Sequence, residues 1–233
     1  MNEAFKPFFE QYEALSASVE RAFETVKNQY PDCVKCKPLC SDCCYAVFDL
    51  TLIEALYINE RFRVKFSGET LEILTERCNR IDRTLYKLKK SAYKAAESGK
   101  EENEILAEMA ETRVRCPMLN DAQMCDIYEF RPLTCKLYGI PTAIGGKGYT
   151  CGLSAFEKGE KYPTAGLDKI QNRLLALSAE LAAAIQSKYM RMGEMLVPLS
   201  MALATVYDDE YLGIQKPGET ATNASEDKTG MAK

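Results

Sequence analysis

The sequence predicts a mainly helical protein, a helical bundle that carries a cysteine-rich, loop-rich, metal-binding cap. Apolar residues recur every three or four positions along several long segments, which is the period of an amphipathic helix. The segment 116–166 has no sustained period and holds seven of the thirteen glycines. Nine of the ten cysteines lie in two groups, at 33–44 and 116–151. We expect one helical domain over 1–214 and a disordered tail over 215–233, where apolar residues are scarce.

The first helix is predicted over about the first thirty residues, and Pro31 ends it. Its apolar stripe, with alternating spacings of three and four, consists of Phe5, Phe8, Tyr12, Leu15, Val19, Ala22 and Val26. Such a stripe is typical of a helix that packs on its own protein, although it also fits a helix that binds a partner.

Two more helices are expected before residue 100. The first begins with a capping box formed by Thr51 and Glu54 and runs towards Phe66. The second follows Ser67-Gly68 and keeps a heptad spacing that places Cys78 on its buried stripe. Free cysteine behaves as a small apolar residue in such a position. We therefore interpret Cys78 as a core residue and not as a metal ligand.

The remainder of the chain is predicted to contain a short helix over 103–112, a loop region and a long helix that starts at Leu167. Pro198 is expected to interrupt this last helix and to open a further one that ends near Val206. A loop region of about fifty residues is unusual in a compact domain unless something holds it together. Metal coordination would supply that constraint.

The composition excludes several kinds of chemistry. The chain has no histidine, so a Ser-His-Asp triad, a Cys-His pair and an HExxH zinc site are ruled out. A formal net charge of −4 indicates no general attraction to nucleic acid. No segment has the run of about 20 apolar residues that a membrane span needs, and the first residues do not resemble a signal peptide. We therefore expect a cytoplasmic protein with reduced thiols and with neither nucleic acid nor membrane as a partner.

The first cysteine group has five members in twelve residues, namely Cys33, Cys36, Cys40, Cys43 and Cys44. Two-residue spacings allow successive thiolates to turn back onto one ion. The second group consists of Cys116, Cys125, Cys135 and Cys151. Because zinc takes four ligands, nine cysteines fit either two centres with one thiol to spare or one centre with extra thiols. The spacing does not decide between these arrangements.

The sequence also leaves the identity of the metal undecided. An all-thiolate site suits zinc and iron–sulfur clusters alike, and the lack of histidine slightly favours a cluster, because many structural zinc sites mix cysteine with histidine. Arg131 is the best candidate to balance the negative charge, since its guanidinium can donate to thiolate sulfur. Tyr128 is expected either to hydrogen-bond near the site or to pack as an aromatic residue.

Several of these motifs together resemble a known family. The vicinal pair Cys43-Cys44 and the element Cys125-x-Ile127-Tyr128-x-x-Arg131-Pro132-x-x-Cys135 are similar to the CxxCxxCC cysteine-cluster family, often called YkgJ-like and described as a zinc- or iron-chelating domain. The resemblance covers about 33–151. This chain departs from the family pattern in the three residues between Cys36 and Cys40, in the additional Cys33, and in an insert over about 65–112.

The resemblance implies metal chelation, with a 4Fe-4S cluster or zinc as the cofactor. Some flagellin lysine-methylating proteins have similar cysteine clusters, so an enzyme is also possible. Three functions are therefore compatible with the sequence. They are a metal-binding protein with an all-thiolate centre joining the two groups, an iron–sulfur-dependent enzyme of electron or group transfer that could modify proteins, and a thiol redox sensor or metal-handling protein.

Overall fold

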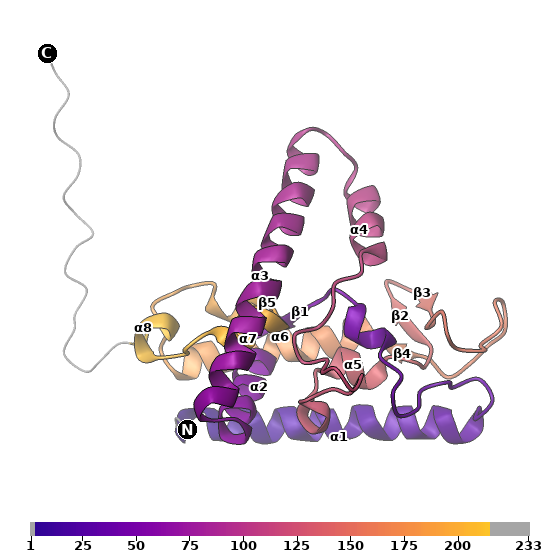
Figure 1. The fold of residues 1–233 in the computed structure, drawn as a ribbon, viewed down its shortest axis with the longest axis horizontal. Helices are drawn as coiled ribbons and strands as arrows, with labels where there is room; N and C mark the ends of the chain where they lie inside the picture. The colour runs from indigo at the N-terminus through magenta and orange to yellow at the C-terminus, as the bar shows by residue number, and fades with distance from the viewer. Residues whose placement is uncertain (1–2, 215–233) are drawn as a thin grey trace, which may run out of the picture.

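The computed structural model describes residues 3–214 and confirms a mainly helical protein (Figure 1). The predicted tail at 215–233 lies outside these residues. The α-helices are α1 (Lys6–Gln29), α2 (Leu52–Lys65), α3 (Gly68–Glu97), α4 (Glu102–Glu111), α5 (Leu133–Leu137), α6 (Leu167–Ala184), α7 (Leu199–Ala204) and α8 (Asp209–Leu212). The 3-10 helices are η1 (Glu3–Phe5), η2 (Asp42–Tyr45), η3 (Tyr128–Phe130) and η4 (Met192–Glu194). The strands are β1 (Asp49–Thr51), β2 (Thr142–Ile144), β3 (Lys147–Tyr149), β4 (Ala165–Gly166) and β5 (Leu196–Pro198).

Helix α2 lies between two groups of buried side chains. The first core cluster consists of Phe5, Phe9, Tyr12, Val19, Val26, Val34, Leu52, Ile53, Leu56, Leu133, Leu137, Ile140, Leu174, Leu177, Leu181, Ile185, Met192 and Leu212. The second core cluster consists of Leu50, Ala55, Ile58, Phe62, Leu74, Cys78, Met118, Ile127, Val197, Leu199, Ala202 and Leu203. Since α2 contributes to both, it is buried on most of its circumference and fixes α1, α5 and α6 relative to α3 and α7.

Most of the predicted helices are confirmed close to their expected bounds. Helix α1 ends at Gln29, just before Pro31, but Phe9 rather than Phe8 is its fully buried phenylalanine. Helices α2, α3 and α4 match the three predicted between Thr51 and Thr112. Cys78 is completely buried within the second core cluster, as expected of a core residue.

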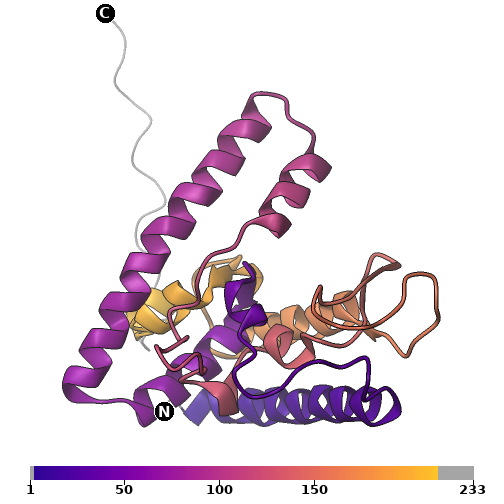
Figure 2. The same cartoon turned by 45° about the vertical axis from the view of Figure 1, so that its right-hand side comes forward.

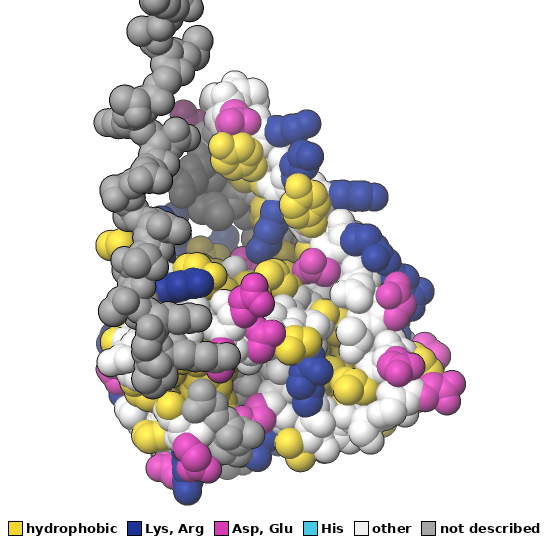
Figure 3. Space-filling view, turned by 90° about the vertical axis from the view of Figure 1, so that its left-hand side faces the viewer, with side chains coloured by type: hydrophobic (Ala, Val, Ile, Leu, Met, Phe, Trp, Pro, Cys, Tyr) yellow, Lys and Arg dark blue, Asp and Glu magenta, His cyan; other side chains and the backbone are white. Residues whose placement is uncertain are grey.

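Helix α3 is longer than the body of the protein requires. Its buried residues are Leu74, Cys78 and Leu85, and the turns beyond Leu85 project from the body beside α4 (Figures 1 and 2). Tyr86 and Tyr93 are exposed on the projecting part. Lys and Arg side chains gather over this part of the surface, with hydrophobic side chains between them (Figure 3).

The predicted capping box at Thr51 and Glu54 is wrong. Thr51 is the N-cap of α2, but its hydroxyl makes no capping hydrogen bond and is buried with no partner among the described residues. The carboxylate of Glu54 points into the interior, where it accepts hydrogen bonds from the Leu133 N–H and the Tyr12 hydroxyl. Because the start of α2 is buried, Glu54 forms contacts between helices and does not cap its own helix. A local sequence motif does not reveal such contacts.

The prediction for the last long helix is wrong in one respect. Helix α6 ends at Ala184 rather than near Pro198, and Gln186 has a φ of +51°, which a continuing helix does not allow. Pro198 ends β5, which pairs antiparallel with β1, and α7 begins directly after it as expected.

In the second sheet β2 lies between β3 and β4. These strands have two or three residues each, too few for alternation to be visible in the sequence.

The helices of the described segment, 3–214, include none with the length and apolar character that a bilayer-spanning helix needs.

Candidate metal centre

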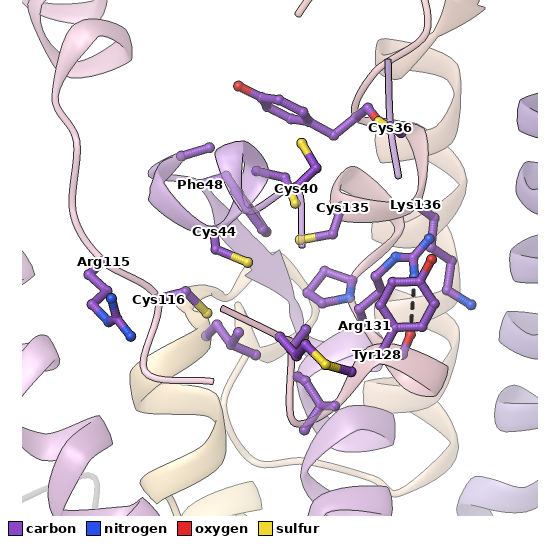
Figure 4. Close-up of a pocket in the computed structure, with 18 of the residues that line it drawn as sticks. Cys36, Cys40, Cys44, Phe48, Arg115, Cys116, Tyr128, Arg131, Cys135 and Lys136 are labelled. Atoms are coloured by element: carbon purple, nitrogen blue, oxygen red, sulfur yellow. Dashed lines mark hydrogen bonds between the residues drawn. The ribbon is translucent and has the colours of Figure 1, made fainter. Parts of the chain in front are cut away.

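Eight of the nine predicted cysteine ligands line one cavity of about 790 Å³ (Figure 4). They are Cys36, Cys40, Cys43, Cys44, Cys116, Cys125, Cys135 and Cys151. The first four come from the segment between α1 and β1. Of the others, Cys116 and Cys125 come from the segment between α4 and η3, Cys135 comes from α5, and Cys151 follows β3. The fold therefore brings together two cysteine groups that are about seventy residues apart in the sequence.

Backbone hydrogen bonds hold the two groups against each other. The N–H of Cys116 donates to the carbonyl of Cys44 at 2.7 Å, and the N–H of Val114 donates to the carbonyl of Tyr45 at 3.1 Å. These two bonds lie at the base of the projecting helices α3 and α4, where the chain returns to the body. The long insert between the groups thus leaves them adjacent in space.

Three of the cysteines sit in tight turns that direct an N–H at their own sulfur. Met118 N–H donates to Cys116 Sγ and Leu153 N–H donates to Cys151 Sγ, each at 3.4 Å. The N–H of Ile127 makes the same kind of bond to Cys125 and lowers its pKa, although burial raises the pKa overall. In each turn the donor is two residues after the cysteine. N–H groups aimed at sulfur stabilise a thiolate and are among the features that tune iron–sulfur centres.

Burial keeps most of these thiols protonated in the absence of metal. Desolvation raises the pKa of Cys36 to about 11 and that of Cys116 to about 12. It also raises the pKa of Cys135 well above its ordinary value, and the nearby Cys43, Cys116 and Cys125 add to this effect. A metal that binds here must displace these protons, so affinity should depend on pH.

The vicinal pair behaves differently from the other thiols. Cys44 donates a hydrogen bond to Cys43, which lowers the pKa of Cys43 and raises that of Cys44. Arg131 lowers the pKa of Cys43 further. Cys43 is therefore the thiol most ready to ionise within the pair, and Cys44 is its proton donor.

Arg131 and Tyr128 both line the cavity, and they contact each other. The Arg131 guanidinium carbon lies 3.8 Å from the centre of the Tyr128 ring, and Nη1 donates to the Tyr128 carbonyl at 3.4 Å. The Tyr128 side chain is otherwise exposed, so its ring packs against Arg131 at the surface and not in the core. The positive charge of Arg131 lowers the pKa of Cys36, Cys43 and Cys125, as expected of a residue that balances thiolate charge.

Cys33 is the one predicted ligand that lies outside the cavity lining. Its carbonyl accepts a hydrogen bond from the N–H of Ala155, and its own N–H donates to the carbonyl of Tyr30. These bonds fasten the start of the first cysteine segment to the loop after Cys151. Cys33 thus has a backbone role at the edge of the site.

A buried polar network positions the short helix that carries Cys135. Glu54 Oε1 accepts from the Leu133 N–H at 2.7 Å, at the start of α5. Lys136 Nζ donates to Ser16 Oγ at 2.7 Å and to Glu20 Oε1 at 2.6 Å, both on α1. The sequence pattern predicted only a helix cap for Glu54. The hydrogen-bond partners of Glu54 and Lys136 lie between 42 and 120 residues away in the sequence, so no local signal revealed these contacts.

The donor set fits a soft metal, but the sulfurs line the wall of a cavity and do not converge on one point. Over the part of the chain that the structure describes, no three cysteine, aspartate or glutamate side chains lie close enough to hold a metal ion. The donors are thiols with Arg131 beside them, and thiolates suit zinc and iron–sulfur clusters. The residues therefore fit such a centre in kind, provided that the thiols shift or a larger group bridges them.

A mainly helical fold that gathers eight cysteines on one cavity defines a cysteine-cluster metal-binding protein. The model of the CxxCxxCC family, whose description is "Putative zinc- or iron-chelating domain", matches residues 35–152. This match spans half of the chain, and the protein belongs to the CxxCxxCC family. Searches of curated proteins and of solved structures gave no match.

Proposed function

We propose that the protein holds an all-thiolate metal centre that joins the first cysteine group to the second, in the reducing environment of the cytoplasm. The observation that carries this proposal is the single cavity lined by eight cysteines from both groups. Each additional thiolate at the metal would also add to the hydrogen bonds that already link these loops. Binding energy is then folding energy, on the order of 10 kcal/mol for a structural zinc.

We favour an iron–sulfur cluster over a single zinc ion. Sulfurs around one zinc lie about 3.8 Å apart, because each Zn–S bond is about 2.3 Å and the geometry is tetrahedral. Among the described residues no three cysteine, aspartate or glutamate side chains are placed to hold one ion, and Cys135 and Cys44 sit on short helices that carry buried residues. A cluster spans a wider gap because each thiolate binds a different iron atom.

Metal and acid-labile sulfide analysis after anaerobic purification tests the proposal, together with a visible spectrum. We expect iron and sulfide in comparable amounts and a broad absorption band near 400 nm. Cys116→Ser/Cys135→Ser should abolish the iron and sulfide, whereas Cys33→Ser should retain them. Stoichiometric zinc in a colourless protein would show that the centre is zinc and not an iron–sulfur cluster. Purified protein that contains no metal and folds normally would refute the whole proposal.

The volume of the cavity favours a second candidate function, that of an iron–sulfur-dependent enzyme. At about 790 Å³ it lies within the roughly 300–1,000 Å³ range of small-molecule sites, and its lining includes Phe23, Phe48 and Leu85 in addition to the cysteines. A closed structural site needs no such space. A bound organic molecule in native mass spectra, or a cluster that cycles reversibly with dithionite and a mild oxidant, would support an enzyme.

A further inference from the structure

We infer that the exposed face of α3 is a docking surface for a second copy of this chain, with the two α3 helices antiparallel. This interface lies outside the cysteine cavity, so it goes beyond the proposed function and does not depend on which metal is bound. Two properties of α3 point to it. Charge changes sign once along its exposed face, and most of these charges have no partner within the chain.

A single stripe of charged side chains runs along the side of α3 that faces away from the core. Its eight members are exposed and recur every three or four residues, which places them on one helix face. The buried residues Leu74, Cys78 and Leu85 lie on the opposite side. The members of the stripe are Glu69, Glu72, Glu76, Arg80, Arg83, Lys87, Lys90 and Lys94.

The first three members of the stripe are glutamates, and the other five are arginine or lysine. Figure 3 shows dark blue side chains along the projecting part of the molecule and magenta ones below them. The helix dipole favours acidic residues at a helix start and basic residues at its end, but only within the first and last turns. Glu76, Arg80 and Arg83 lie well inside the 30-residue helix, so the dipole does not explain their order.

Most charges of the stripe have no ion-pair partner. Among the side chains that the structure describes, the only ion pair made by the stripe joins Arg83 Nη2 to Glu76 Oε1 at 3.2 Å. Both side chains stay well exposed, at 64% and 60%. Such a solvated pair contributes little to stability, so both residues can take partners on another molecule.

An antiparallel second copy gives each half of the stripe a complementary half. Parallel helices would place glutamate against glutamate, whereas a two-fold axis between antiparallel helices makes the surface self-complementary. A register one heptad away would place Arg80 opposite Arg83 of the second copy, so we favour helices that cross at the level of Cys78. Each glutamate then faces a basic residue of the second copy, in the pairs Glu69 with Lys87, Glu72 with Arg83, and Glu76 with Arg80.

Exposed apolar groups flank the stripe and add area to the contact. Tyr86 and Tyr93 lie one heptad apart beside the basic half and are 63% and 65% exposed, and Ile73 beside the acidic half is 55% exposed. The Lys90 ammonium lies 5.9 Å from the centre of the Tyr86 ring. Tyrosine is enriched in protein interfaces, and its ring buries apolar area that an ionic contact lacks.

A polyanion such as nucleic acid fits this surface less well. It would match the basic half of the stripe, but the three glutamates of the other half would repel it. The chain also carries a formal net charge of −4. A second copy satisfies both halves at once.

Sedimentation velocity of the anaerobically purified, reduced protein tests for the dimer over a series of protein concentrations. The wild type should form a dimer at low salt, and its dissociation constant should rise at least about 10-fold between about 0.1 M and about 1 M NaCl, because the screening length falls from about 10 Å to about 3 Å. A protein that stays monomeric at every concentration in low salt would overturn the inference.

Charge reversal tests the antiparallel pairing. Glu76→Arg should weaken the dimer at least 10-fold, and Glu76→Arg/Arg80→Glu should restore it, because the facing charges are exchanged. Glu10→Arg, at an exposed position of α1, is the control with the same change of charge and should dimerise like the wild type. A double variant that stays as weak as Glu76→Arg, with unchanged helix content by circular dichroism, would overturn the pairing.

Mixing two variants separates the second copy from a polyanion. Glu69→Lys/Glu72→Lys/Glu76→Lys and Arg80→Glu/Arg83→Glu/Lys87→Glu should each be monomeric, and their equimolar mixture should form a dimer. If the mixture stays monomeric while the first variant binds single-stranded DNA, the face serves a polyanion and the inference fails. Iron and sulfide should stay at the wild-type level in every variant, so a loss of the dimer alone leaves the proposed function intact.

Discussion

The buried carboxyl of Glu54 makes stability depend on pH in a direction opposite to that of most acidic residues. Desolvation raises its pKa from 4.5 to about 7, even though the Leu133 N–H and the Tyr12 hydroxyl both donate to it. The folded protein thus holds the proton more tightly than the unfolded chain does. The resulting stabilisation is fully present below pH 4.5 and is lost as the pH rises to about 7.

The magnitude follows from the two pKa values. A rise from 4.5 to about 7, at about 1.4 kcal/mol for each pH unit, corresponds to about 3 kcal/mol of unfolding free energy. Glu54→Gln keeps an acceptor for both donors and cannot ionise. Compared with this variant, the wild type should therefore lose about 3 kcal/mol between pH 4.5 and 7.

Urea unfolding at a series of pH values measures this difference directly, and subtracting the variant from the wild type cancels the pH dependence of the shared metal ligands. Glu72→Gln is the control, because Glu72 is exposed on α3 and should leave the curve unchanged. A difference between wild type and Glu54→Gln that stays constant from pH 4.5 to 8 would refute the assignment.

Three further substitutions test other contacts. Tyr12→Phe removes a hydrogen bond that lowers the pKa of Glu54, so the pH-dependent loss should extend above pH 7 in the same urea series. Asn59→Ala should cost about 1–3 kcal/mol in urea unfolding, because Asn59 Nδ2 donates to the carbonyls of Ala202 and Thr205 at the end of α7; an unchanged midpoint would contradict this. Gly193→Ala should lower the free energy of unfolding by about 1–3 kcal/mol, since its Cβ would lie 2.6 Å from Ala179 Cα. A melting temperature equal to that of the wild type would contradict this and show that η4 shifts without cost.

The sequence predicted the helices because their apolar periodicity reflects local geometry. Heptad spacing located α3 and placed Cys78 in the core, and Pro31 marked the end of α1. The strands β1 and β5 have three residues each and pair across almost 150 positions. Nothing local in such short segments distinguishes them from loops, so their pairing was not predictable.

The candidate site likewise has features that the local sequence predicts and features that depend on distant contacts. The residue types and their clustering pointed to thiolate chemistry, and eight of the nine candidates line one cavity. Spacing alone could not show that Cys33 lies outside it, since Cys33 and Cys36 have the separation of a metal-binding pair. Nor could it show that Glu54 supports the helix that carries Cys135, because that contact forms only when α1, α2 and α5 pack together.

The most direct test of the account is to identify which cysteines a bound metal protects. The anaerobically purified protein would be treated with iodoacetamide before and after removal of metal, and labelling at each cysteine would be measured by peptide mass spectrometry. The account predicts that at least four of the eight cavity cysteines, drawn from both groups, are protected with metal and become reactive without it. Cys33 should react in both states and Cys78 in neither. Equal labelling of every cavity cysteine with and without metal would contradict the claim that cysteines of this cavity hold it.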